Sequence, residues 1–181
     1  SSLVGITIPN STKKIGNGVF RGCTGLTNVT ISDSLTEIGK EAFLGCSNLT
    51  SIAIPNSVTK IEESAFRDCT GLTNVSIPES LTEIGKEAFL GCSNLTSIAI
   101  PNSVTKIEES AFRDCTGLTN VSIPESLSEI GKEAFFGCSG LTTIVIPNSV
   151  TKIEESAFRG CTGLANVTIS DSLSEIGKEV L

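Results

Sequence analysis

Residues 49–71 read LTSIAIPNSVTKIEESAFRDCTG, and this 23-residue stretch returns along the whole chain. Cysteine shows the period most plainly, because it occurs only at residues 23, 46, 69, 92, 115, 138 and 161. A unit of about 20 to 50 residues at fixed spacing is typical of a solenoid, in which each unit buries its apolar face against its neighbours. The sequence therefore predicts one solenoid segment over residues 1–181, with about eight coils.

The first six residues of each unit predict a short strand. In Leu49–Ile54 apolar and small polar residues alternate at the end of the run, and β-branched types are frequent. Pro55 then ends the strand, because proline has no amide hydrogen for a ladder. One such strand in every coil predicts a parallel sheet along one side of the solenoid.

The second half of the unit predicts a helical turn. Its apolar residues fall at helical offsets: Ile61, Ala65, Phe66 and Cys69. These offsets lie on one side of a helix, and the preceding glutamates and the following Arg67 suit its dipole. We therefore predict an α/β solenoid, with short helical or 3-10 turns on the side opposite the sheet.

The whole unit, L-x-x-I-x-I-P-x-S-V-x-x-I-x-x-x-A-F-x-x-C-x-x, resembles the Treponema-type leucine-rich repeats of bacterial BspA-like surface proteins. Residues 49–71 spell the pattern in full, and all eight units follow it. The resemblance implies a leucine-rich-repeat, right-handed superhelix. It also implies a secreted or cell-surface location and adhesion to host proteins or to other cells.

The charged residues indicate a second period of 46 residues. Lysine and glutamate alternate at the twelfth position of successive units: Lys14, Glu37, Lys60, Glu83, Lys106, Glu129, Lys152 and Glu175. The fifteenth position alternates in the opposite phase from Lys40 to Lys178. We predict that each lysine faces glutamates in both neighbouring coils and another three residues away in its own coil. Such a network would fix the register among near-identical coils.

The cysteines are predicted to form a structural ladder: Cys23, Cys46, Cys69, Cys92, Cys115, Cys138 and Cys161. Seven is an odd number, so they cannot all form internal disulfides. Neighbouring coils would bring two of them within about 5 Å, inside disulfide range, but identical rungs favour no single pairing. We expect buried free thiols that pack as small apolar groups. A straight row without histidine does not converge as a zinc site requires, so no metal or other cofactor is expected.

Composition and charge disfavour several functions. The chain has no histidine for a Ser–His pair, and its acidic residues are spread along rows instead of gathered in one cleft. The serine at the ninth position of each unit, such as Ser57, is instead predicted to bond the backbone at a turn. A net charge of −7 argues against nucleic acid and anionic membranes as partners. No apolar run is long enough to predict membrane insertion.

The outward positions of the predicted sheet are the candidate binding surface. We place a ligand-binding site on this concave face at Thr50, Ser51, Thr73, Asn74, Thr96, Ser97, Thr119, Asn120 and Thr142. The side chains of this face are small, polar and uncharged, and it lacks the Tyr and Trp anchors of tight protein interfaces. The alternative interpretation is therefore a solvated surface that binds no ligand. A further row alternates Arg67 and Arg113 with Leu90 and Phe136, as a contact strip or as shelter for arginine stems.

These patterns favour a non-enzymatic module over an enzyme, which would need a unique polar cluster. The first interpretation is an extracellular adhesin segment that binds a host-matrix or microbial surface protein, or a glycan. The alternative is a spacer with no ligand of its own. We expect the segment to come from a longer protein, and its open apolar ends to allow head-to-tail self-association.

Overall fold

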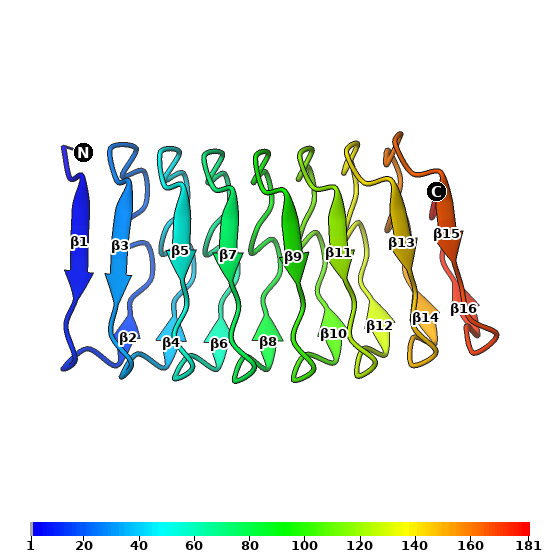
Figure 1. Ribbon diagram of the computed structural model, residues 1–181, viewed down its shortest axis with the longest axis horizontal. Coiled ribbons are helices and arrows are strands. Elements are labelled where there is room, and N and C mark those ends of the chain that lie inside the picture. The colour runs from blue at the N-terminus through cyan, green and yellow to red at the C-terminus, as the bar shows by residue number, and fades with distance from the viewer. Residues whose placement is uncertain (1) are drawn as a thin grey trace.

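The computed structural model describes residues 2–181, so the part of the predicted solenoid that falls on Ser1 lies outside the described residues. It is a rod of stacked coils, with β1 at one end and β15 and β16 at the other (Figure 1). Each coil contributes one longer and one shorter strand. The chain termini therefore lie at opposite ends of the rod (Figure 1).

The longer strands fall within the predicted six-residue runs but are only three or four residues long. They are β1 (Gly5–Ile8), β3 (Asn28–Ile31), β5 (Ser51–Ala53), β7 (Asn74–Ser76), β9 (Ser97–Ala99), β11 (Asn120–Ser122), β13 (Thr143–Val145) and β15 (Asn166–Thr168). They pair in parallel two by two, β1 with β3, β5 with β7, β9 with β11 and β13 with β15. The middle residue of β5, Ile52, points into the core while its neighbours face outward, as the pleat requires. The parallel strand in each coil is therefore confirmed, but the described residues form four two-stranded sheets on this side instead of the single sheet expected.

A second set of strands was not predicted. They are β2 (Lys14–Ile15), β4 (Glu37–Ile38), β6 (Lys60–Ile61), β8 (Glu83–Ile84), β10 (Lys106–Ile107), β12 (Glu129–Ile130), β14 (Lys152–Ile153) and β16 (Glu175–Ile176). They form two parallel four-stranded sheets, β2-β4-β6-β8 and β10-β12-β14-β16. A two-residue strand is too short to show an alternation in the sequence, so these strands can be recognised only from their pairing in the stacked coils.

The predicted helical turns are wrong, because residues 2–181 contain turns in this segment and no helix. Ser64 and Asp68 have φ of 56° and 57°, and a right-handed helix requires negative φ. Amides also bond outward to the next coil: Phe66 N donates to Ala88 O at 2.8 Å. Other amides bond within the coil, as Arg67 N does to Ser64 O at 3.1 Å, so the segment is a series of turns tied to the next coil and not a helix.

The core is one continuous apolar column, as the repeat predicts. The phenylalanine rings stack from Phe20 to Phe158, with successive centroids 5.2 to 5.5 Å apart. Leucine, isoleucine, valine, alanine and cysteine side chains pack around this stack. No coil buries this surface alone, so each is stabilised by its neighbours.

Candidate interaction surface

The predicted binding residues lie at the start of the longer strands or immediately before them. All nine are exposed: Thr50, Ser51, Thr73, Asn74, Thr96, Ser97, Thr119, Asn120 and Thr142. The strand register sets Ser51 beside Asn74 in β5 and β7. It sets Ser97 beside Asn120 in β9 and β11 in the same way. The face is therefore a regular array of small polar side chains.

The threonine hydroxyls of this face are partly engaged by the stack itself. Thr73 Oγ1 donates to Thr50 O at 3.1 Å, and Thr119 Oγ1 donates to Thr96 O at 3.1 Å. Their hydrogens are thus directed along the rod, while the oxygen lone pairs remain open to solvent. The row therefore offers acceptors to a ligand more readily than donors.

The shorter strands carry the alternating charges. The ladder register sets Lys60 beside Glu37 on one side and Glu83 on the other. Lys14 Nζ lies 2.6 Å from Glu37 Oε1, and this hydrogen bond raises the pKa of Lys14 and lowers that of Glu37. The Lys40–Glu63 pair at 3.0 Å belongs to the second row and raises the pKa of Lys40.

One detail of the predicted network is wrong. Within a coil, Lys60, Lys106 and Lys152 of the first row each contact the glutamate two residues further on, at 3.9, 3.5 and 2.7 Å, whereas Lys14 is followed there by Gly16. None of these lysines reaches the glutamate three residues away in any ion pair of residues 2–181. Successive side chains of an extended chain alternate in direction, so positions two apart share a side.

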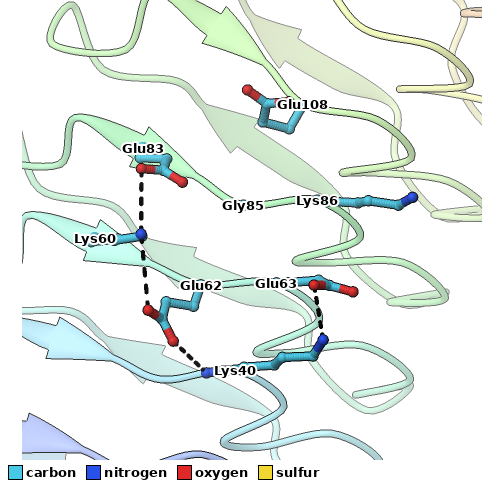
Figure 2. Close-up of a pocket in the computed structure, with 8 residues that line it drawn as sticks. All are labelled: Lys40, Lys60, Glu62, Glu63, Glu83, Gly85, Lys86 and Glu108. Atoms are coloured by element: carbon cyan, nitrogen blue, oxygen red, sulfur yellow. Dashed lines mark hydrogen bonds and ion pairs between the residues drawn. The ribbon is translucent and has the colours of Figure 1, made fainter.

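Two shallow hollows lie along this charged face. The first, of about 480 Å³, is lined by Lys40, Lys60, Glu62, Glu63, Glu83, Gly85, Lys86 and Glu108 (Figure 2). Another of about 370 Å³ recurs four coils further along, between Lys132 and Lys178. In the first hollow Lys60 bridges Glu62 and Glu83, while Glu62 Oε2 accepts the Lys40 amide at 2.9 Å. Every charged residue of the first hollow is in an ion pair, which favours a structural role.

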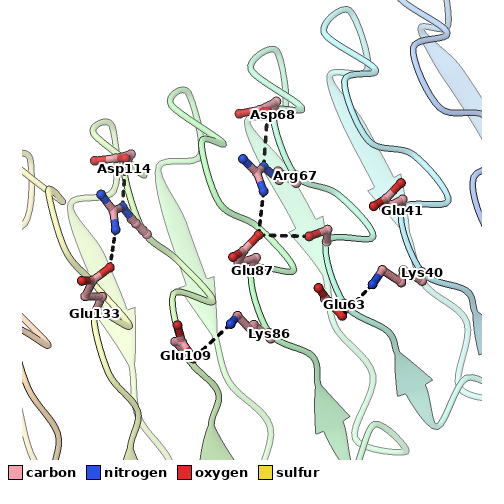
Figure 3. A network of polar contacts seen from close by, with 12 residues as sticks. Lys40, Glu41, Glu63, Arg67, Asp68, Lys86, Glu87, Glu109, Asp114 and Glu133 are labelled. Carbon is pink, nitrogen blue, oxygen red and sulfur yellow. Dashed lines mark hydrogen bonds and ion pairs between the residues drawn. The ribbon is translucent and has the colours of Figure 1, made fainter.

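A third ion-pair row was missed from the sequence. Arg67 Nη1 lies 2.7 Å from Glu87 Oε2, and Ser64 Oγ hydrogen bonds the same oxygen at 3.2 Å (Figure 3). Arginine recurs in alternate units with a glutamate 20 residues later, a spacing that could have identified the row. Arg113 Cζ also lies 4.5 Å from the Phe136 ring centroid, so Phe136 packs against an arginine as the shelter interpretation expects.

The contacts between coils are of two alternating kinds. Within a coil pair, defined as two units such as residues 49–94, the longer strands hydrogen bond and arginine meets glutamate. Between coil pairs, Lys40 meets Glu63 and the Glu62 carboxylate bonds the Lys40 amide. The charge period of 46 residues therefore corresponds to two distinct contact surfaces.

The cysteines lie in the core. Six are buried, Cys23 is half-buried, and none of them forms a disulfide within residues 2–181. Each buried thiol lies 3.1 to 3.2 Å from a phenylalanine carbonyl of the preceding coil, as Cys69 Sγ does from Phe43 O. Burial raises the pKa of Cys46 and of Cys161 to about 11. Such thiols are weak nucleophiles, because the thiolate is the reactive form.

The ninth-position serines behave as predicted in part. Ser80 Oγ donates to Val58 O at 2.7 Å, and Ser126 Oγ donates to Val104 O at 2.9 Å. The buried hydroxyls of Ser57 and Ser149 have no hydrogen-bond partner among residues 2–181. The described residues hold no cluster of three or more His, Cys, Asp or Glu side chains suited to a metal. They also contain no helix that is long and apolar enough to cross a membrane.

Comparison with protein families identifies one match. The family described as "BspA type Leucine rich repeat region" matches six copies over residues 1–116 and 82–181. These two ranges overlap and together extend over the whole chain. No curated protein matches the chain.

Several solved bacterial structures are similar. The T. pallidum leucine-rich repeat protein TpLRR is 25% identical, with a TM-score of 0.68 over 98% of this chain and 74% of that one. A leucine-rich repeat protein from Eubacterium ventriosum is 30% identical, with a TM-score of 0.76 over 93% and 44%. A leucine-rich cell surface protein from Faecalibacterium prausnitzii is 31% identical, with a TM-score of 0.54 over 94% and 61%. The chain thus spans less than two thirds of the length of the last two.

Proposed function

Because the chain belongs to the family of BspA-type leucine-rich repeats, we propose that it is an extracellular adhesin segment of a cell-surface protein. Modules of this family and fold are protein-interaction scaffolds and not enzymes. The proposed partner is a protein of the host matrix or of another microbial surface, bound through the outward face of the longer strands. The surface location is supported by the F. prausnitzii relative, which is described as a cell surface protein.

The observation that carries this proposal is the repeated exposed surface along the starts of β5, β7, β9, β11 and β13. Its nine predicted residues are all exposed, and their polar side chains recur at the spacing of the coils. An array of small side chains lets an extended protein segment approach the backbone closely. Weak contacts repeated along the rod can add to a useful affinity, since a ligand held at one coil is concentrated near the next.

Binding through this face is tested by placing bulky charge on it. Ser97→Arg and Asn120→Arg alter exposed outward positions of β9 and β11, so we expect the coil to fold and the binding to fall. The measurement is surface plasmon resonance against a panel of purified extracellular-matrix proteins. Thr105→Arg is the matched control, because Thr105 is exposed just before the shorter strand β10.

The spacer is the alternative, and one observation favours it. In the first charged hollow every charged side chain is in an ion pair, which leaves few groups for a ligand. Absence of binding to every matrix protein and to whole microbial cells would support the spacer. Equal loss of binding in Thr105→Arg and Ser97→Arg would also contradict the proposed face.

We also propose that two copies of the 181-residue chain associate head to tail. Glu175 and Lys14 would continue the alternation of the twelfth position, and Ile176 in β16 is 60% exposed. Sedimentation velocity at rising concentration is expected to show dimers. A monomer at every concentration would contradict this association.

A further inference from the structure

One row of acidic side chains stands apart from the ion pairs of the rod. The eighth position of successive units alternates asparagine and acid: Asn10, Asp33, Asn56, Glu79, Asn102, Glu125, Asn148 and Asp171. Within residues 2–181, every acidic residue outside this row forms an ion pair except Glu175. The four acids of this row therefore have no ion-pair partner among the described residues, and they recur along one line of the rod.

This acidic row borders the exposed sheet face, just after the longer strands end. A hollow of about 340 Å³ lies between β11 and β13, where Glu125 and Val145 both contribute to the lining. A neighbouring hollow of about 370 Å³ lies towards β15 and shares these two residues, with Asp171 on its far side. Val145 is 64% exposed, whereas the same position in β5 and β9 holds alanine. The surface at β11–β15 therefore combines unpaired carboxylates with an exposed apolar side chain.

We propose that this surface docks an extended, lysine-rich peptide segment of a partner protein. This inference rests on the proposed function, because it assigns a chemistry to the partner of the same sheet face. A lysine side chain suits both groups, since its aliphatic stem can cover Val145 while its ammonium reaches Glu125. The unneutralised carboxylates supply the charge complementarity that selects a cationic partner.

The spacing of the acidic row indicates how the lysines of the peptide should be spaced. Acids recur every second coil, and successive coils are 5.2 to 5.5 Å apart at the stacked rings, so two coils span twice that distance. A polyproline II segment rises about 3.1 Å per residue, so every third residue returns to the same side after about 9.3 Å. A peptide with lysine at every third position thus follows the row, and the long lysine side chains reach across the remaining difference. A separation of this size also disfavours a shared calcium ion, whose oxygen ligands lie within about 2.6 Å.

The test uses the whole chain and a labelled peptide of four Lys-Pro-Thr repeats, with binding followed by fluorescence anisotropy. We expect saturable binding that weakens as salt rises. Glu125→Asn, a change to the residue that alternate coils already carry, is expected to weaken binding about two- to fivefold. Val145→Ala, the residue found in β5 and β9, is expected to weaken it about threefold.

Glu175→Gln is the matched control, because it removes an unpaired exposed acid from the shorter strand β16. Equal weakening by Glu175→Gln and Glu125→Asn would mean that only net charge matters and would overturn the proposal. So would equal binding of a peptide with the same composition but contiguous lysines. If Ser97→Arg abolishes binding to a matrix protein while the lysine peptide does not bind, the proposed function stands and this inference fails.

Discussion

The buried thiols show why one residue type fills the same position seven times. A thiol is small enough for the space beside the phenylalanine stack, and it lies within hydrogen-bond distance of a carbonyl in the preceding coil, as between Cys92 Sγ and Phe66 O at 3.2 Å. Alanine would fit the space but leave that position without a polar contact. The free-thiol ladder thus contributes packing and a weak polar contact in the same side chain.

Burial of the thiols predicts a loss of stability in alkali. An unfolded thiol has a pKa near 9.0, while that of Cys46 is about 11 in the folded chain. Below pH 9 both states hold the proton and stability is complete. As the pH rises further the unfolded state releases protons first, so the free energy of unfolding should fall.

Urea unfolding between pH 8.5 and 10 measures this slope, which is at most about 1.4 kcal/mol per pH unit for each thiol. Cys92→Ala removes one buried thiol, and burial raises the pKa of Cys92 well above its usual value. The variant is therefore expected to show a shallower slope, whatever its absolute stability. A pH-independent free energy over this range would contradict the argument.

Substitutions at two glycines distinguish the cost of a positive φ from the cost of a steric clash. Gly22 has φ of 66°, and an added Cβ would meet nothing within 4 Å, so Gly22→Ala is expected to cost about 1 kcal/mol. At Gly85 a Cβ would lie 2.7 Å from the Glu62 carbonyl carbon, so Gly85→Ala is expected to cost about 2 to 3 kcal/mol. Chemical unfolding of both variants checks the order, and a larger loss for Gly22→Ala would reverse the explanation.

At the level of elements, the alternating charges of the shorter strands fix the register in which successive coils stack. Glu129 lies between Lys106 at 3.3 Å and Lys152 at 3.8 Å. Glu83 has one such partner, Lys60 at 3.7 Å. The two glutamates therefore differ in how much a reversed charge should disturb the ladder.

Glu129→Lys is expected to cost about 1 kcal/mol at low salt, and Glu83→Lys about half of that. Both losses should shrink at high salt, because these pairs are partly exposed and salt screens them. Thermal unfolding at two salt concentrations measures the difference. Glu125→Lys, at an acid outside the ion pairs, is the control, and a loss independent of salt would contradict the role of charge.

The longer strands could be predicted from sequence because the signal is local. Leu49–Ile54 carries its alternation and its terminating Pro55 in one short run. The helical turn was predicted wrongly because the offsets from Ile61 to Cys69 fit a helix equally well. Glycine at the twentieth position of most units was the contrary signal, since that position has positive φ throughout, including Asp68 at 57°.

The binding face could be predicted only as far as its position. The alternation of β5 indicates which side chains point outward, and all nine predicted residues are exposed. The direction of the Thr73 hydroxyl and the exposure of Val145 depend on the distance between coils. That distance is set by stacking, which no single unit encodes.

For the whole molecule, the coil pair predicts that deleting two coils destabilises the chain less than deleting one. Removing residues 72–94 would set Lys60 beside Lys106 and Glu63 beside Glu109. Removing residues 72–117 would instead restore opposite charges, with Lys60 beside Glu129. We therefore expect the 46-residue deletion to be more stable than the 23-residue deletion, although it loses more of the core.

Circular dichroism during thermal unfolding ranks the two deletions against the full chain. If all contacts between coils were equivalent, stability would fall with each coil removed, so the 46-residue deletion would be less stable than the 23-residue deletion. That order would contradict the coil pair as the structural unit. Deletion of residues 95–140, which is also a whole 46-residue block, should match the 72–117 deletion.

The position of the two termini at opposite ends of the rod has a mechanical consequence (Figure 1). Tension applied between them loads the contacts between coils in series, so the weakest contact yields first. Both the longer and the shorter strands pair within a coil pair, as β5 with β7 and β6 with β8, while within residues 2–181 only shorter strands such as β4 and β6 pair between coil pairs. The rod would therefore lengthen in steps of one coil pair, each releasing about 150 Å of extended chain, and would behave as a tether that absorbs strain.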